Sequence, residues 1–220
     1  MYNIAIDGPA GAGKRTIAKK AAKKLDFIYV DTGAMYRAIA LYFIRNGVAA
    51  DDEKTISEKC SDINVSIDYV DGVQQVILNG ENVNDYIRTE QVSMMTSSVS
   101  KYPAVREKLL NLQRQLATEK NVIMDGRDIG TCVLPDAKTK IFLTASAGER
   151  ARRRYKEQVE RGIECDIKQI EKDIIARDEQ DMNREIAPLK QAEDAVLIDS
   201  SDMSIEQVVD AIIDVFEKTK

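Results

Sequence analysis

Short apolar runs alternate with longer segments of helical periodicity along most of the chain. The runs with strand character are 2–7, 27–30, 122–125, 140–143 and 195–198. The segments with helical character are 17–25, 34–45, 89–101, 104–119, 147–161, 167–177 and 204–218, and the last begins with a capping box at Ser204. Residues 51–61 are a polar helix or loop. This alternation predicts parallel βαβ units, so the fold class is α/β with a central parallel sheet.

One region departs from this pattern. Residues 63–70 and 73–78 alternate apolar and polar positions, and the turns after them are Asp71-Gly72 and Asn79-Gly80. Both dipeptides favour the tight turns of β-hairpins. Residues 63–84 are therefore predicted to form a small, three-stranded antiparallel insertion.

Composition narrows the function classes. The chain has 220 residues, 44% of them hydrophobic and 31% charged, which suits one globular domain. The net charge of −5 gives no general attraction to nucleic acid, and no apolar run reaches the length of a membrane span. Three distant cysteines favour a reduced, cytoplasmic setting. The absence of histidine excludes His-based triads and argues against a zinc hydrolase.

The stretch between the first strand and the first helix is rich in glycine. It reads Gly-Pro-Ala-Gly-Ala-Gly-Lys-Arg-Thr at residues 8–16, in the strand–loop–helix context of a phosphate-binding P-loop. Successive backbone N–H groups of such a loop bind phosphate oxygens, and the helix N-terminus adds its positive dipole end. The predicted ATP-binding residues are Gly8, Pro9, Ala10, Gly11, Ala12, Gly13, Lys14, Arg15 and Thr16.

Arg15 departs from the usual motif. A serine or threonine normally follows the lysine, and its hydroxyl ligates Mg²⁺. Here Thr16 comes one residue later, as the threonine does in the Gly-Lys-Gly-Thr loops of small nucleotide kinases, so Thr16 is the candidate metal ligand. Because arginine is bulky, we expect a weakened response to Mg²⁺.

Two further groups of polar residues follow strands. Asp31 to Arg37 comes after the second strand, and Asp125 to Asp128 follows the strand at 122–125. Ligands bind at the carboxyl ends of parallel strands. Arg37 and Arg127 are therefore predicted to bind a second anion, the phosphate of a substrate.

Arginines also cluster on two helices near the C-terminal third. The first cluster is 150–154, and the second contains Arg177, Asp181 and Arg184, which share one helical face. Either cluster can be an ordinary exposed helix with paired charges. The functional alternative is a mobile lid, which surrounds a transferred phosphoryl group with positive charge and excludes water.

Taken together, these motifs resemble those of bacterial cytidylate kinases. The matching segments are 8–16, Asp-Thr-Gly-Ala-Met-Tyr-Arg at 31–37, Ile-Arg-Thr-Glu at 87–90, Asp-Gly-Arg-Asp-Ile-Gly at 125–130 with Pro-Asp-Ala at 135–137, and Arg-Asp-x-x-Asp-x-x-Arg at 177–184. The loop alone is generic, whereas the combination is specific, and the resemblance runs from residue 2 to near 217.

The resemblance implies a fold and an activity. The fold is that of P-loop nucleoside monophosphate kinases, with a five-stranded parallel sheet flanked by helices, a small antiparallel β insertion and a helical lid. Within one kinase domain, 1–220, the core comprises 1–62, 85–145 and 190–220, the monophosphate-binding insertion is 63–84, and the lid is 146–185. The activity is phosphorylation of CMP and dCMP by Mg²⁺-bound ATP, a step of pyrimidine nucleotide metabolism. A monomer is expected.

The resemblance also assigns residues. Lys14, Arg127 and Arg184 would be catalytic, and Arg37 and Arg127 would hold the CMP phosphate. The other substrate-binding residues would be Ser97, Arg106 and Asp128 at the cytosine, and Thr32, Arg177 and Asp181 near the sugar and its phosphate. Asp125 or Asp31 is a candidate to hold a water of the Mg²⁺ ion, which keeps several waters in such sites.

Other functions stay open at this stage. One is a P-loop kinase for another small phosphate-accepting metabolite, and another is a nucleotide-binding protein impaired by Arg15. A GTPase-type switch normally carries Asn-Lys-x-Asp, and no asparagine here is followed by lysine.

Overall fold

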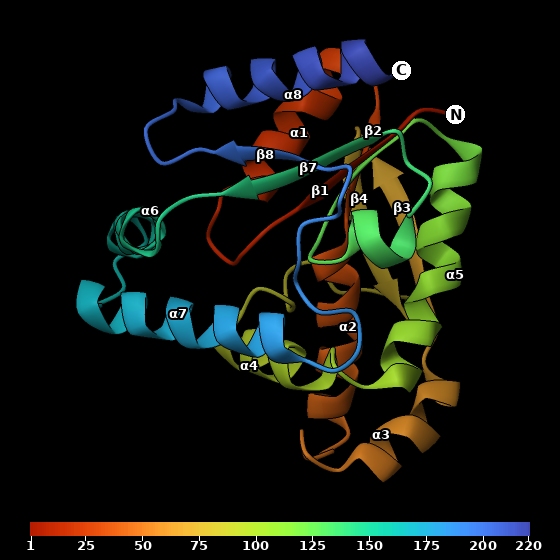
Figure 1. The fold of residues 1–220 in the computed structure, drawn as a ribbon. Coiled ribbons are helices and arrows are strands. Elements are labelled where there is room, and N and C mark those ends of the chain that lie inside the picture. Colours follow the sequence, from red (N-terminus) through yellow and green to blue (C-terminus); the bar gives the residue numbers. More distant parts are fainter.

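A five-stranded parallel sheet forms the centre of the computed structural model, which describes all residues 1–220 (Figure 1). Its strands lie in the order β2-β6-β1-β7-β8. Their bounds are β1 Asn3–Asp7, β2 Ile28–Asp31, β6 Val122–Asp125, β7 Thr139–Thr144 and β8 Val196–Asp199. The predicted sheet is confirmed. The strand carrying the glycine-rich loop is central, which places that loop in the middle of the sheet's carboxyl edge.

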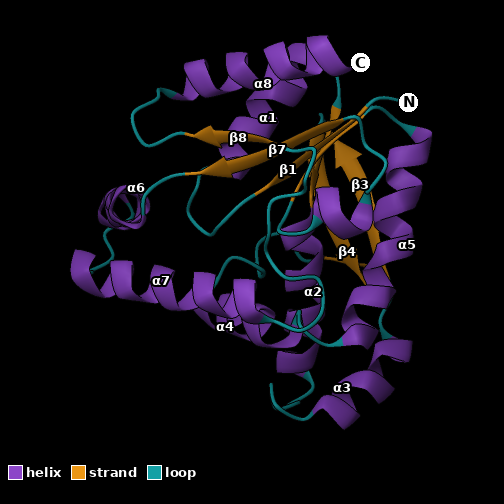
Figure 2. Cartoon of the chain, viewed as in Figure 1, coloured by secondary structure: helices purple, strands orange, loops and turns teal.

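Helices cover both faces of the sheet (Figure 2). On one face lie α1 (Lys14–Leu25) and α8 (Ile205–Thr219), and on the other lie α2 (Thr32–Arg45) and α5 (Pro103–Glu119), with α3 (Glu53–Lys59) and α4 (Glu90–Val99) beyond them. Each face has its own buried apolar cluster. None of the helices has the length and apolar character needed to cross a bilayer.

The two ends of the chain meet at one end of the sheet. Phe216 of α8 contacts Tyr2 and Phe27 edge to face, with ring centroids 5.6 and 5.4 Å apart. The first strand begins one residue later than predicted, at Asn3; the Tyr2 carbonyl still accepts from the Val122 amide at 3.1 Å, but the Tyr2 side chain is 48% exposed and not buried. Its ring instead covers the end of α8.

The predicted meander is present as a separate three-stranded antiparallel sheet. It consists of β3 (Val65–Val70), β4 (Val73–Leu78) and β5 (Glu81–Asn82). Val76 and Leu78 point into the apolar cluster shared with α2, so one face of the meander is part of the core. The other face is mixed, because it carries Ser66, Asp68 and Gln75 beside the exposed Val70 and Val73.

Helices α6 (Ala147–Glu160) and α7 (Ile167–Asn183) pack on one another to one side of the sheet (Figure 1). Their shared apolar cluster contains only Ala151, Ile170 and Ile174 as buried members. The predicted helical end near residue 177 is wrong, since α7 continues to Asn183 and contains both Arg177 and Asp181, as their spacing indicated. Arg184, expected on the same helical face, is the extended C-cap and lies outside the helix. Apolar periodicity stops near residue 177, but Asp178 and Asp181 are buried by charged partners on other elements, and the helix continues through them.

A π-helical segment, Ile129–Val133, follows Asp128 and was not predicted. The Asp7 carboxylate accepts hydrogen bonds from the amides of Ile129 and Gly130 at 2.8 and 2.7 Å. At the other end, Arg114 donates to a carbonyl of the segment, that of Val133, at 3.0 Å. Because these anchors come from β1 and α5, local sequence alone does not indicate the segment.

Gly8 and Gly47 provide a matched test of the loop geometry. Both have positive φ, 148° and 64°, but a Cβ at Gly8 would lie 1.9 Å from the Leu143 carbonyl oxygen, whereas nothing lies within 4 Å of one at Gly47. We expect Gly8→Ala to cost more than about 4 kcal/mol of unfolding free energy and Gly47→Ala about 1 kcal/mol. Urea denaturation measures both, and equal losses would contradict this packing.

Candidate functional site

The glycine-rich loop presents uncapped backbone donors. It connects β1 to α1, and Gly11 and Gly13 take positive φ values of 78° and 83°. Gly13 is the N-cap of α1, so no side chain caps the helix. The amide groups at the start of α1 are therefore free of side-chain caps, in the arrangement that binds phosphate oxygens.

Lys14 is buried within this loop. Its Nζ donates to the carbonyl oxygens of Gly8 and Pro9 at 2.6 and 2.8 Å. Burial, followed by the charge of Arg127, holds the pKa of Lys14 well below its ordinary value. The ammonium group thus lies among the loop carbonyls, and an anion in the loop would favour its charged form.

Arg15 does not turn into the loop. Its side chain is 53% exposed, and its Nε lies 3.4 Å from Oδ2 of Asp31. Thr16 is also exposed and lies in the first turn of α1. The bulk of Arg15 is therefore directed toward the end of β2, away from the backbone donors.

Asp31 organises the start of α2. One carboxylate oxygen caps the helix by accepting from the Ala34 amide at 2.9 Å, and the other accepts from Nη2 of Arg88 at 2.6 Å. Beside it, the Thr32 hydroxyl donates to the Asp125 carbonyl at 2.7 Å. The motif at 87–90 gave no role to Arg88, because its partner lies more than fifty residues away in the chain.

Asp125 is the second carboxylate at this edge of the sheet. It is paired in register with Asp31 across β2 and β6, and it accepts from the Tyr29 hydroxyl at 2.8 Å. Burial, followed by the charge of Asp31, raises the pKa of Asp125. The two carboxylates lie side by side at the strand ends, and that of Asp31 is already paired with Arg88.

A chain of opposite charges runs from α5 to α7. Asp128, which follows β6, forms ion pairs with Arg106 of α5 and with Arg184. Arg184 is also 3.9 Å from Asp181 of α7, and Asp181 in turn accepts from Nε of Arg127 at 2.8 Å. The structure thus brings together five of the predicted residues from three separate segments.

The carboxylates of this chain are shifted in opposite directions. Burial raises the pKa of Asp128 and outweighs the lowering effect of Arg106 and Arg184. For Asp181, burial also acts to raise the pKa, but Arg127, Arg177 and Arg184 together outweigh it, and the pKa is lowered. The charge of Asp181 is therefore the better stabilised of the two.

Arg37 and Arg177 converge on one hydroxyl group. Each donates to Oγ of Ser93 in α4 at 3.3 Å. Burial, followed by the charges of Arg88 and Arg177, lowers the pKa of Arg37 to about 10. Nε of Arg177 is buried without a partner. Sequence analysis missed Ser93, because a helical serine gives no signal until the two arginines meet it.

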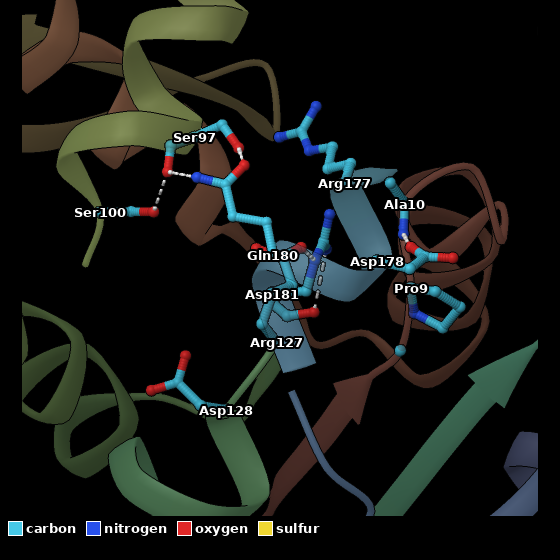
Figure 3. Close-up of polar contacts among 12 residues, drawn as sticks. Pro9, Ala10, Ser97, Ser100, Arg127, Asp128, Arg177, Asp178, Gln180 and Asp181 are labelled. Carbon is cyan, nitrogen blue, oxygen red and sulfur yellow. Dashed lines mark hydrogen bonds and ion pairs between the residues drawn. The ribbon is translucent and has the colours of Figure 1, made fainter. Parts of the chain in front are cut away.

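Ser97 lies away from the charged chain, at the contact between α4 and α7. Its hydroxyl donates to Oε1 of Gln180 at 3.1 Å, and the Gln180 amide donates back to the Ser97 carbonyl at 3.3 Å (Figure 3). The predicted contact of Ser97 with a base is not tested by this geometry. What the geometry gives is a link between two helices on either side of the site.

The lid region reaches the glycine-rich loop through two buried residues. Arg150 of α6 and Asp178 of α7 form an ion pair at 2.6 Å. Arg150 donates to the Ala10 carbonyl at 2.8 Å, and Asp178 accepts from the Ala10 amide at 3.3 Å; Figure 3 shows Asp178 beside Ala10. The arrangement is a closed contact between the loop and both helices.

Sequence analysis did not single out this pair, because Arg150 and Asp178 were hidden within clusters of charge. Of their neighbours, Arg152 fits the ordinary alternative of an exposed helix with paired charges, whereas Arg153 also donates to the Ser200 hydroxyl and carbonyl at 3.2 and 2.6 Å. Arg152 and Arg153 pair with Glu149 on the same helix, both at 3.0 Å.

Known proteins are similar to this chain over nearly its whole length. A family model described as cytidylate kinase matches residues 4–218. A cytidylate kinase from Caldicellulosiruptor bescii is 52% identical over 216 residues, covering 98% of this chain and 96% of the relative. One from Shouchella clausii is 48% identical over 217 residues, covering 99% and 96%. In fold alone, an uncharacterized protein from Eubacterium ventriosum is similar, with a TM-score of 0.51, 13% identity and 99% coverage of both chains.

The raised pKa of Asp125 predicts a pH effect on stability. A carboxyl group whose folded pKa is raised stabilises the fold below its ordinary value of 3.8, and this contribution is lost as pH rises through the folded pKa. Asp125→Asn imitates the protonated form, so its unfolding free energy relative to the parent should increase between about pH 4.5 and about pH 8. Urea denaturation at both pH values measures the difference.

Asp136→Asn, on the exposed surface, controls for the change in net charge alone. A parent-to-variant difference for Asp125→Asn that stays constant with pH would contradict the assignment of a raised pKa.

Proposed function

The chain belongs to the cytidylate kinase family, and we infer that it transfers the γ-phosphoryl group of ATP to CMP and dCMP, giving ADP and CDP or dCDP. The observation that carries this inference is the meeting of two anion sites under one lid. The glycine-rich loop supplies backbone donors, and Arg37, Arg127 and Arg177 gather around the next strand ends.

ATP is the donor on the glycine-rich loop in this proposal. Its phosphates accept from the amides at the start of α1, whose dipole favours negative charge there. The triphosphate also supplies negative charge that favours the charged form of Lys14 and draws Nζ from the carbonyls of Gly8 and Pro9.

The acceptor phosphate is held by arginine side chains. Arg37 and Arg177, which share Ser93, carry more positive charge than their surroundings neutralise, and a dianionic phosphate supplies the missing charge. Arg127 reaches the same phosphate by leaving Asp181 in part, while Thr32 and Asp181 lie toward the sugar. The substrate thereby competes with a carboxylate for a guanidinium group.

Cytosine is read by Asp128 and Arg106. Cytosine presents an amino donor at N4 beside acceptors at N3 and O2. Asp128 accepts from N4 and Arg106 donates to N3 or O2, and Ser97 of α4 is proposed as a further contact of the base. Uracil places an oxygen where the amino group was, so Asp128 would face an acceptor. A buried carboxylate left without a donor costs far more than a weak hydrogen bond gains.

Magnesium accompanies ATP in this proposal. The nearby oxygen donors are the Asp125 and Asp31 carboxylates and the Thr16 hydroxyl, and no group of three or more acidic, histidine or cysteine side chains forms a metal cage. This set fits an ion bound mainly by phosphates and water, as Mg²⁺ commonly is. When bound, the ion supplies positive charge against the phosphate oxygens.

No strong general base is needed, because the acceptor oxygen of CMP is already anionic. The protein aligns the two phosphates and neutralises charge, with Lys14 on one side and Arg127 and Arg184 on the other. The contact of Arg150 and Asp178 with Ala10 closes α6 and α7 over the loop and excludes water.

The alternatives have no observation in their favour. Arg15 points away from the backbone donors and pairs with Asp31, so the loop is not blocked by its bulk. A metabolite without a base would offer no groups for the ion-paired residues around Asp128 to recognise. A monomeric enzyme in the cytoplasm, without nucleic acid or membrane partners, remains a prediction.

Substrate choice gives the decisive test. In an assay that couples ADP release to absorbance, we expect CMP and dCMP to be phosphorylated, with kcat/KM for CMP at least about a hundredfold above that for UMP, a value typical of sites with buried polar recognition groups. Equal efficiency with CMP and UMP would contradict the role of Asp128.

Two variants test the proposed catalytic residues in the same assay. Lys14→Ala and, separately, Arg184→Ala should lower kcat by orders of magnitude, on the order of a hundredfold or more as for other lost charge-stabilising groups. Because Arg184 is a buried ion-pair partner of Asp128, its loss should also lower the unfolding free energy, so the rates are measured at temperatures where each variant is folded. Near-normal rates in both would remove the proposed chemistry from this site.

Arg15 should alter the response to magnesium. Arg15→Ser restores a hydroxyl at the usual motif position and removes the ion pair with Asp31. We expect this variant to reach half-maximal rate at a lower free Mg²⁺ concentration than the parent, at fixed ATP. Superimposable Mg²⁺ titrations would show that the position tolerates arginine.

A further inference from the structure

The β insertion grips the end of β2 through one buried side chain. Gln74 of β4 is 9% exposed, and its amide engages both backbone groups of Asp31. Oε1 accepts from the Asp31 amide at 2.8 Å, and Nε2 donates to the Asp31 carbonyl at 3.2 Å. Because β2 is an edge strand, the glutamine amide takes the place of the missing strand neighbour.

Other polar contacts support this grip. The Tyr69 hydroxyl of β3 donates to the Tyr29 carbonyl of β2 at 3.3 Å. Within the insertion, Asn84 donates to the Gln74 carbonyl at 2.9 Å, and this hydrogen bond holds the backbone of Gln74 in place. A cavity of about 150 Å³ lies between the insertion and α1, with Gln74, Arg15 and Arg88 on its walls. At the edge of this cavity, the hydrogen bonds of the Gln74 side chain connect the insertion to β2.

Asp31, whose backbone Gln74 holds, in turn positions arginine side chains near the proposed site of the acceptor phosphate. With its backbone fixed, Asp31 directs its carboxylate to the Ala34 amide, to Arg88 at 2.6 Å and to Arg15 at 3.4 Å. Arg88 in turn lies close enough to Arg37 for its charge to help lower the pKa of Arg37. A shift of Asp31 would therefore leave Arg88 without its partner beside the proposed phosphate site.

We propose that Gln74 is a positioning residue for the acceptor nucleotide, which it serves by clamping Asp31 and thereby holding Arg88 in place. This gives the insertion a role in catalysis beyond covering part of the core, and it rests on the proposed function for the identity of the acceptor. Loss of the clamp leaves the buried Asp31 amide without its acceptor and frees the carboxylate to move.

The test compares Gln74→Ala with Gln75→Ala. Gln75 is the next residue on the same strand, and its side chain contacts Asn82, Asn84 and the Val73 carbonyl, all within the insertion. We expect Gln74→Ala to raise KM for CMP about tenfold, equivalent to about 1.4 kcal/mol, and to leave KM for ATP within about twofold. Gln75→Ala should leave both constants within about twofold of the parent.

A double-mutant cycle separates positioning from loss of stability. In an Arg88→Met background, Gln74→Ala should raise KM for CMP much less than it does in the parent, because the pathway is already broken. All rates are measured well below the midpoint of thermal unfolding of each variant. Additive effects of the two changes, or an unchanged KM for CMP in Gln74→Ala, would overturn the proposal.

Amide exchange at Asp31 distinguishes this proposal from the proposed function. Slow exchange in the parent should become fast in Gln74→Ala and stay slow in Gln75→Ala, whichever nucleotide is the substrate. If the parent does not phosphorylate CMP but Asp31 loses protection, the function fails and the clamp stands. If Asp31 stays protected in Gln74→Ala, the clamp itself is refuted.

Discussion

The buried carboxylates Asp128, Asp178 and Asp181 are each paired with an arginine, and the placement of α6 and α7 depends on these pairs. An unpaired charge in a low-dielectric interior costs several kcal/mol, roughly 3–5 when one member of a buried pair is removed. Asp128, Asp178 and Asp181 are all buried, and each is matched by an arginine from another element. The apolar cluster of α6 and α7 is small by comparison, so charge pairing determines where these helices lie over the sheet.

This mode of attachment has a consequence for substrate binding. A phosphate would not weaken the contacts of a helix pair held by apolar packing. In a helix pair held by arginine–carboxylate pairs, a phosphate can compete with the carboxylates for the arginines. A phosphate near Arg127 competes directly with Asp181, and the partners of Arg37 and Arg177 are neutral hydroxyl and carbonyl groups that an anion outmatches. In the proposed function, Arg127–Asp181 is the ion pair of α7 with which the acceptor phosphate competes.

The sheet supplies the rigid reference for both anion sites. β1 ends at Asp7, whose carboxylate holds the π-helical segment after Asp128 while its neighbour Gly8 begins the phosphate loop. The two halves of the site thus share one strand end. Gln74 fixes the end of the edge strand β2 in a comparable way, by hydrogen bonds to the backbone of Asp31.

Local sequence determined the strands, most helices, the β meander and the phosphate loop, because periodicity and glycine conformational needs act within a few residues. It also supplied the combination of motifs that marks the family. Only the tertiary structure decided which polar and charged groups meet. It brings Arg37 and Arg177 to the Ser93 hydroxyl and Arg88 to Asp31. It also brings the ion pair of Arg150 and Asp178 to the backbone of Ala10. The spacing of Arg177 and Asp181 indicated that α7 continues past Arg177, but not which partners bury its last turns. Charge pairing across long stretches of chain has no period and no fixed spacing, so it is settled only when the sheet brings the strand ends together.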